Sequence, residues 1–145
     1  VKHFALRVVT TSVATKMMHL GVLILASVTV CLARVEHRVG GWSEVDPNSA
    51  PIYLELAHFA VASNTEGLDH YYTPIEVTRA ERQVVAGVNY RLEVKVAPSV
   101  CSVVETEYDK DRCHPQPDAE TKTCVVRVYD IPWRQERRVT SFSCS

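Results

Sequence analysis

The sequence lacks the short motifs that carry catalysis and metal binding in proteins. It contains no Gly-x-Ser-x-Gly, no phosphate-binding loop, and no Cys-x-x-Cys or pair of histidines at metal-ligand spacing. The domain's histidines, His37, His58, His70 and His114, stand outside any local motif that would pair them with a nucleophilic cysteine. We therefore expect a protein that is not an enzyme and that holds no cofactor or metal ion.

Positive charge is not in excess either. Sixteen basic residues stand against seventeen acidic ones, and no stretch shows the clustered lysines and arginines that phosphate binding requires. Nucleic acid is therefore not an expected partner.

Long hydrophobic runs are absent except for one near the start. Residues 20–32 form an uncharged run of thirteen residues, whereas a helix needs roughly 20 residues to cross a bilayer. The run is typical of the hydrophobic segment of a secretory signal peptide, and the small residues Cys31 and Ala33 suit cleavage after Ala33. A membrane anchor or a core helix is the alternative. The charged residues that follow, 34–38, argue against it.

These features divide the chain into two parts. Met17 and Met18 directly precede the run, so we expect residues 1–33 to be an upstream segment with a signal peptide. Residues 34–145 are then one secreted, extracellular domain. It carries thirteen basic and seventeen acidic residues, a net charge of −4 with neutral histidines.

Cysteine is sparse, with five in the chain. Cys31 falls in the signal segment, and the remaining four are Cys101, Cys113, Cys124 and Cys144. An even number in a small exported domain favours disulfides, although four cysteines allow three pairings. A zinc site is the alternative. The absence of a Cys-x-x-Cys or a pair of histidines at ligand spacing disfavours it.

The hydrophobic pattern predicts one helix followed by strands. Apolar or small residues recur at helical spacing between about Ala50 and Ser63, at Ile52, Leu56, Phe59, Ala60 and Ser63. Residues 46–49 supply capping side chains, and Pro51 suits a first helical turn.

Residues 76–79 and 88–96 alternate polar and apolar side chains, with Pro98 expected to close the second strand. A long loop at 101–121 and further strands at 123–129 and 137–144 complete the prediction. The expected fold is α+β, with one helix wrapped by an antiparallel sheet.

The run Gln83-Val84-Val85-Ala86-Gly87 connects the first two strands. It predicts a β-hairpin in which Gly87 takes a positive φ. The tip of this hairpin would be small, apolar and exposed to water.

This run matches the Gln-x-Val-x-Gly motif of the cystatins, protein inhibitors of papain-like cysteine proteases. Gly40-Gly41 upstream, Pro132-Trp133 downstream and the four late cysteines occur in the same order as in that family. From about Val39 to the C-terminus the chain resembles the secreted, two-disulfide (type 2) cystatins. The strand at 91–97 and the short segment after the helix look most like secreted arthropod forms, which act in saliva or gut.

The resemblance implies more than the residues alone establish. It selects the disulfides Cys101–Cys113 and Cys124–Cys144 and adds a short strand before the helix, which makes a sheet of four to five strands. It also implies that three segments form a wedge that enters the active-site cleft of a protease: Arg38-Val39-Gly40, Gln83 to Gly87, and Pro132-Trp133.

Inhibition by such a wedge would be reversible, tight and competitive, with cathepsins of the L, S, C or B type as targets. The alternative is a cystatin scaffold that binds or carries a ligand without inhibiting proteases. We expect a monomer, with a dimer that exchanges the first hairpin as the alternative.

Overall fold

The computed structural model describes residues 40–145. The expected signal segment, the domain start at residue 34, and the wedge residues Arg38 and Val39 lie outside the described part. The elements that follow are β1 (Ser43–Val45), α2 (Ile52–Ser63), β2 (His70–Val84), β3 (Val88–Ser102), β4 (Lys122–Ile131), the 3-10 turn η1 (Pro132–Arg134) and β5 (Glu136–Cys144).

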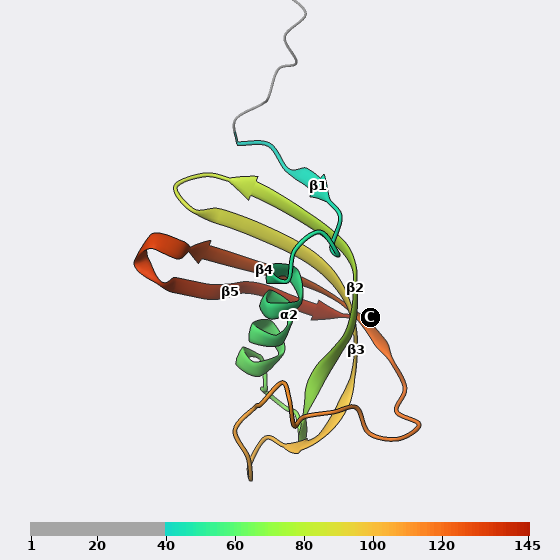
Figure 1. Cartoon of the computed structure of the whole chain (residues 1–145). Coiled ribbons are helices and arrows are strands. Elements are labelled where there is room, and N and C mark those ends of the chain that lie inside the picture. The colour runs from blue at the N-terminus through green and yellow to red at the C-terminus, as the bar shows by residue number, and fades with distance from the viewer. Residues whose placement is uncertain (1–39) are drawn as a thin grey trace, which may run out of the picture. The chain divides into compact units, whose positions relative to one another are not determined.

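The strands form one antiparallel sheet in the order β1-β2-β3-β4-β5, which curves around the helix α2 (Figure 1). This confirms the predicted α+β class and the short first strand. The strands follow one another across the sheet in chain order, and α2 lies in the connection between β1 and β2. Within residues 40–145, no helix is long and apolar enough to cross a membrane.

The strand β3 is longer than predicted because Pro98 does not end it. Pro98 pairs with Tyr72 of β2, and β3 continues to Ser102. On its other side, β4 pairs with β3 only as far as Val96. Position 98 therefore lies at an edge of the sheet, where the missing N–H of proline breaks no hydrogen bond between strands. The carbonyl of Pro98 accepts a hydrogen bond from the amide of Gln116 in the following loop.

The buried face of α2 also differs from the prediction. The fully buried positions are Tyr53, Leu56, Ala57, Ala60 and Val61, whereas Ile52 and Phe59 only flank the core and Ser63 is exposed. Apolar residues occupy most positions around this helix, so spacing alone cannot decide its orientation. The expected side-chain cap is missing too, because the side chain and carbonyl of Asp46 hold a turn before the helix.

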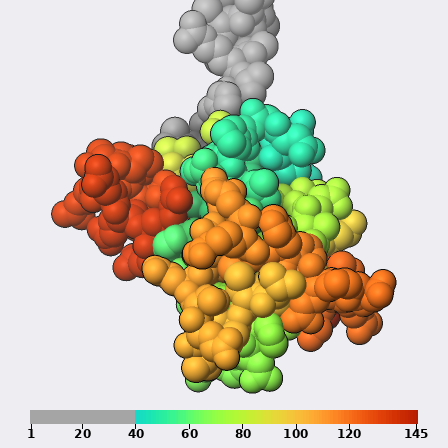
Figure 2. Space-filling view, turned by 60° about the horizontal axis from the view of Figure 1, so that its bottom comes forward, coloured from blue at the N-terminus to red at the C-terminus, as the bar shows by residue number. Residues whose placement is uncertain are grey.

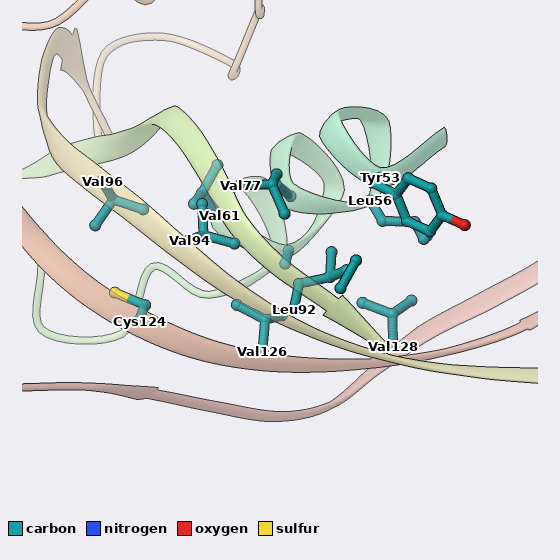
Figure 3. Close-up of a cluster of buried hydrophobic side chains, with 13 residues drawn as sticks. Tyr53, Leu56, Val61, Val77, Leu92, Val94, Val96, Cys124, Val126 and Val128 are labelled. Atoms are coloured by element: carbon teal, nitrogen blue, oxygen red, sulfur yellow. The ribbon is translucent and has the colours of Figure 1, made fainter. Parts of the chain in front are cut away.

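The core lies between α2 and the concave face of the sheet (Figure 3). Alternate residues of the central strands supply it, among them Leu92, Val94, Val126 and Val128. The period-two pattern read from the sequence at 88–96 therefore does mark the face that packs on the helix.

Two disulfides hold the later part of the chain. Cys101 is bonded to Cys113 and Cys124 to Cys144, the pairing that the resemblance implied. The first closes the loop after β3, and the second joins the start of β4 to the end of β5. In Figure 2 this loop, in orange, gathers over the end of the molecule that faces the viewer, and the second hairpin, in red, projects to one side.

Candidate functional site

The tips of the two hairpins lie next to each other at one end of the sheet (Figure 1). The β2–β3 hairpin closes at the pair Val84 and Val88, and the amide of Val85 donates to the carbonyl of Gly87 at 2.9 Å. The β4–β5 hairpin closes through η1. Because Val88 of β3 pairs with Asp130 of β4, the two turns leave the sheet at the same level.

Gly87 joins the two tips through close packing. Its φ is not positive, contrary to the sequence-based expectation. A Cβ at this position would instead lie 2.8 Å from the carbonyl oxygen of Asp130 and 2.9 Å from the hydroxyl oxygen of Tyr129. That hydroxyl also donates to the carbonyl of Ala86 at 3.4 Å. Glycine is therefore needed here for lack of space rather than for backbone freedom.

The third predicted segment meets the first hairpin at Gly40. The side-chain amide of Gln83 donates to the carbonyl of Gly40 at 2.7 Å, and Asn89 donates to the side-chain oxygen of Gln83 at 3.1 Å. Gly40 has a φ of +91°, a conformation that other residues adopt only with strain. The chain thus turns at Gly40, directly beside the motif residue Gln83.

Apolar side chains on both tips face the solvent. Trp133 is 69% exposed, Val84 57% and Val85 46%, and Ala86 and Pro132 are exposed as well. Large apolar groups at these fractions are not core residues, and their grouping at one end makes this end the candidate interaction site. The structure therefore brings together all the predicted site residues that it describes, from Gly40 to Trp133.

The residues that support the second tip were not predicted from the sequence. The carboxylate of Asp130 is buried and accepts from Arg137 at 2.9 Å, and the Arg137 guanidinium lies 5.7 Å from the ring centre of Phe59 on α2. Gln135, with φ +53°, closes η1 by donating its amide to the carbonyl of Pro132. The sequence does show opposite charges on either side of Pro132-Trp133, at Asp130 and Arg137, which could have suggested an ion pair. Only the fold shows that Asp130 is buried.

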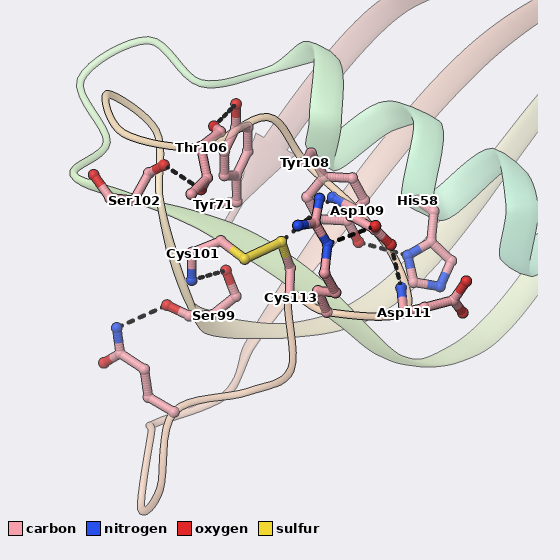
Figure 4. The surroundings of a disulfide bond; sticks show 12 residues. His58, Tyr71, Ser99, Cys101, Ser102, Thr106, Tyr108, Asp109, Asp111 and Cys113 are labelled. Atoms are coloured by element: carbon pink, nitrogen blue, oxygen red, sulfur yellow. Dashed lines mark hydrogen bonds and ion pairs between the residues drawn. A yellow bond between two sulfur atoms is a disulfide. The ribbon is translucent and has the colours of Figure 1, made fainter.

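Within residues 40–145, no group of His, Cys, Asp and Glu side chains is arranged to hold a metal ion. His58, the histidine of α2, belongs to the loop end of the molecule, where its Nδ1 lies 2.6 Å from the hydroxyl of Tyr108 (Figure 4). Partial burial, together with the charge of Lys110, lowers the pKa of His58.

The small apolar turns and the exposed Trp133 at one end of the sheet are features of a protein that binds another protein. Residues 40–133 match the Cystatin domain. The chain therefore belongs to the cystatin family, the protein inhibitors of cysteine proteases.

Known relatives agree with this assignment. The chain is 54% identical over 129 residues to Cystatin-1 of Ornithodoros moubata, which covers 89% of this chain and 100% of the relative. It is 42% identical to a Salivary cystatin-L of Ixodes scapularis, covering 85% of this chain and 92% of the relative.

Two solved structures are also similar. The crystal structure of a salivary cystatin from the soft tick Ornithodoros moubata has a TM-score of 0.69 and 44% identity, covering 73% of this chain and 97% of that one. The structure of Mialostatin, a gut cystatin from the hard tick Ixodes ricinus, has a TM-score of 0.67 and 36% identity, covering 72% and 97%. The chain is thus similar to secreted arthropod cystatins, as its sequence indicated.

Proposed function

We propose that this protein inhibits papain-like cysteine proteases by inserting the wedge into their active-site cleft. The observation that carries the proposal is the shared position of Gly40, Val84, Val85 and Trp133 at one end of the sheet. Family membership supplies the class of target, and this geometry supplies the surface that would enter the cleft.

Each part of the wedge has a separate role in this proposal. Val39 occupies the apolar S2 subsite of the protease and Arg38 the next subsite out, while Gly40 lets the chain bend into the cleft. Val84, Val85 and Ala86 form a low apolar surface for a narrow groove. Gln83 and Gly87 shape the tip that carries them.

The second tip supplies a large anchor. Trp133 offers an aromatic surface of the kind most enriched at binding hot spots, and Pro132 stiffens the backbone that presents it. The wedge covers the catalytic cysteine of the protease without offering it a peptide bond in an attackable position. Inhibition is therefore reversible and competitive with substrate.

The natural form in this proposal is a secreted monomer released by cleavage of a signal peptide, with neither nucleic acid nor membrane as partner. The similarity to salivary and gut cystatins supports an extracellular role.

Titration of the oxidised protein against papain and cathepsins L, S, C and B tests the proposal. We expect one molecule of protein to abolish the activity of one molecule of protease, and a rise in substrate concentration to restore activity. Absence of inhibition at micromolar concentration would contradict the proposal and favour the non-inhibitory carrier.

A further inference from the structure

The strand β1, which begins just after Gly40, is weakly held by its backbone. It contains three residues, pairs only with β2, and exposes Ser43 and Glu44. Val45 is its single residue packed against the core. So short an edge strand has little intrinsic stability, and its position depends on side chains.

Side chains on the outer face of the sheet supply a connected attachment. The guanidinium of Arg91 on β3 lies 4.8 Å from the ring centre of Trp42, the residue before β1. The same guanidinium is ion-paired with Glu81 of β2, which also contacts Arg79 at 3.6 Å. Arg79 in turn forms two contacts of 3.3 Å with Glu44 of β1. We call these five residues the arm anchor.

The anchor is more than a set of exposed ion pairs, which usually contribute little. The side chain of Glu81 at its centre is only 12% exposed. The hydrogen bond from Arg91 lowers the pKa of Glu81, which keeps the carboxylate charged. The guanidinium that stacks on Trp42 is therefore fixed from its other side, and stacking of a fixed cation on an indole ring is favourable.

The anchor and Gln83 hold the same segment at different points. Gln83 bonds to the carbonyl of Gly40, while Arg91 and Arg79 hold Trp42 and Glu44. The backbone from residue 40 to 45 is therefore fixed against the first hairpin. Gly40, at which the preceding residues join the domain, is then held beside the first hairpin before a protease is met, which lowers the ordering cost of binding.

We propose that Trp42, held by Arg91, is a positioning residue that directs the segment Arg38-Val39 into the protease cleft. The inference rests on the proposed function, because it concerns the contribution of that segment to inhibition. Trp42 acts in it through the backbone of the arm rather than through contact with the enzyme.

Hydrogen exchange tests the attachment without any protease. We expect Trp42→Ala in the full oxidised chain to speed exchange of the β1 amides about fivefold, while Trp42→Phe restores most of the protection. Arg91→Lys keeps the charge beside Glu81 but loses the flat stacking group, so it should act like Trp42→Ala. Lys95→Gln is the matched control, because Lys95 is on β3 like Arg91 and the variant breaks only its exposed ion pair with Glu76 of β2. Unchanged exchange in Trp42→Ala would overturn the inference.

A double-mutant cycle tests the consequence for inhibition. We expect Trp42→Ala to weaken inhibition about fivefold when Val39 is present and less than about twofold in a Val39→Gly background. An equal effect in both backgrounds would mean that Trp42 contacts the protease or acts on the whole fold, and would overturn the inference. Should the unmutated chain fail to inhibit, the proposed function fails and this consequence with it. The exchange measurement reports on the attachment of β1 in either case.

Discussion

Gly87 shows how one position can set the geometry of a whole surface. Its neighbours Asp130 and Tyr129 belong to a different hairpin, more than forty residues away along the chain. The contact leaves no room for a side chain, and it keeps the apolar tip of the first hairpin beside the second. The close packing of the first turn on β4 therefore requires glycine at this position of the motif.

We expect Gly87→Ala to weaken both stability and inhibition. The methyl group would meet the backbone of Asp130 at 2.8 Å, and overpacking of this kind costs about 1–3 kcal/mol of unfolding free energy. The shift that relieves the clash separates the tips, so the inhibition constant should rise about tenfold or more. Urea unfolding and titration against papain measure the two effects.

Gly67→Ala is the matched control. Gly67 has a φ of +73° and open space around it, so alanine there strains the backbone without touching the wedge. Stability should fall and inhibition should stay unchanged. Inhibition by Gly87→Ala equal to that of the unmutated chain would contradict the packing argument.

Trp133 carries the exposed aromatic surface of the second tip. We expect Trp133→Ala to weaken inhibition by about 2 kcal/mol or more, roughly thirtyfold, because truncation removes a hot-spot side chain. Unfolding free energy should change little, since the side chain is 69% exposed. Val104→Ala, at a 90% exposed valine in the loop after β3, is the control. No effect of Trp133→Ala on any target would remove this residue from the site.

Among the elements, the loop after β3 is separate from the wedge. Cys101–Cys113 closes it, and Ser99 pairs with Pro115 beside the disulfide. In Figure 4 the loop lies against α2 and β2 through Tyr108 and Tyr71. The hairpin tips proposed to form the wedge are at the far end of the same strands, so we expect the loop and the wedge to be separable in experiments.

We expect the double variant Cys101→Ser with Cys113→Ser to lose stability but retain inhibition. The bridge joins residues 12 apart, and on the chain-entropy account a loop of this size contributes about 3 kcal/mol. Urea unfolding should show this loss. Titration against papain at a temperature where the variant stays folded should show an unchanged inhibition constant, and a weakened one would mean that the loop and the wedge are coupled.

For the whole molecule, the partial burial of His58 links stability to pH. The pKa of His58 is lowered below its ordinary value by burial and by Lys110, with Asp111 opposing the shift. The unfolded chain therefore binds a proton at this residue more readily than the folded one. This contribution to stability is complete above a pH of about 6.5 and is lost as the pH falls through the folded pKa.

We expect the unfolding free energy to decrease between pH 7.5 and pH 5, and to decrease less in His58→Gln. Glutamine can keep a hydrogen bond to Tyr108 but does not titrate. Urea unfolding of both proteins at both pH values measures the difference. An equal decrease in the two proteins would assign the pH dependence to other groups.

Much of this molecule can be predicted from local patterns. Alternation at 88–96 identified a half-buried strand, and the run from Gln83 to Gly87 identified a hairpin tip. These predictions succeed because side-chain direction along a strand is set by the residue itself and its immediate neighbours. The family resemblance added the disulfide pairing, which the count of cysteines left open.

Two of the misjudged features, the end of β3 and the buried face of α2, depend on distant neighbours. Pro98 is tolerated within β3 because β4 ends its pairing at Val96, and α2 buries Tyr53 and Ala57 because the sheet curves over that side of an apolar helix. Neither cause is visible in the flanking sequence. The first depends on where β4 stops pairing with β3, and the second depends on how the sheet bends over α2.

The chain by itself determined which segments become strands and helix and which turns are apolar, since these follow from local periodicity and residue type. The family resemblance indicated which residues belong to the inhibitor motif. Only the tertiary structure decided that Gly87 must be small, that Asp130 is buried, and that Arg91 reaches Trp42. Each of these depends on the close approach of backbones far apart in sequence. Such approaches follow from the register and curvature of the whole sheet.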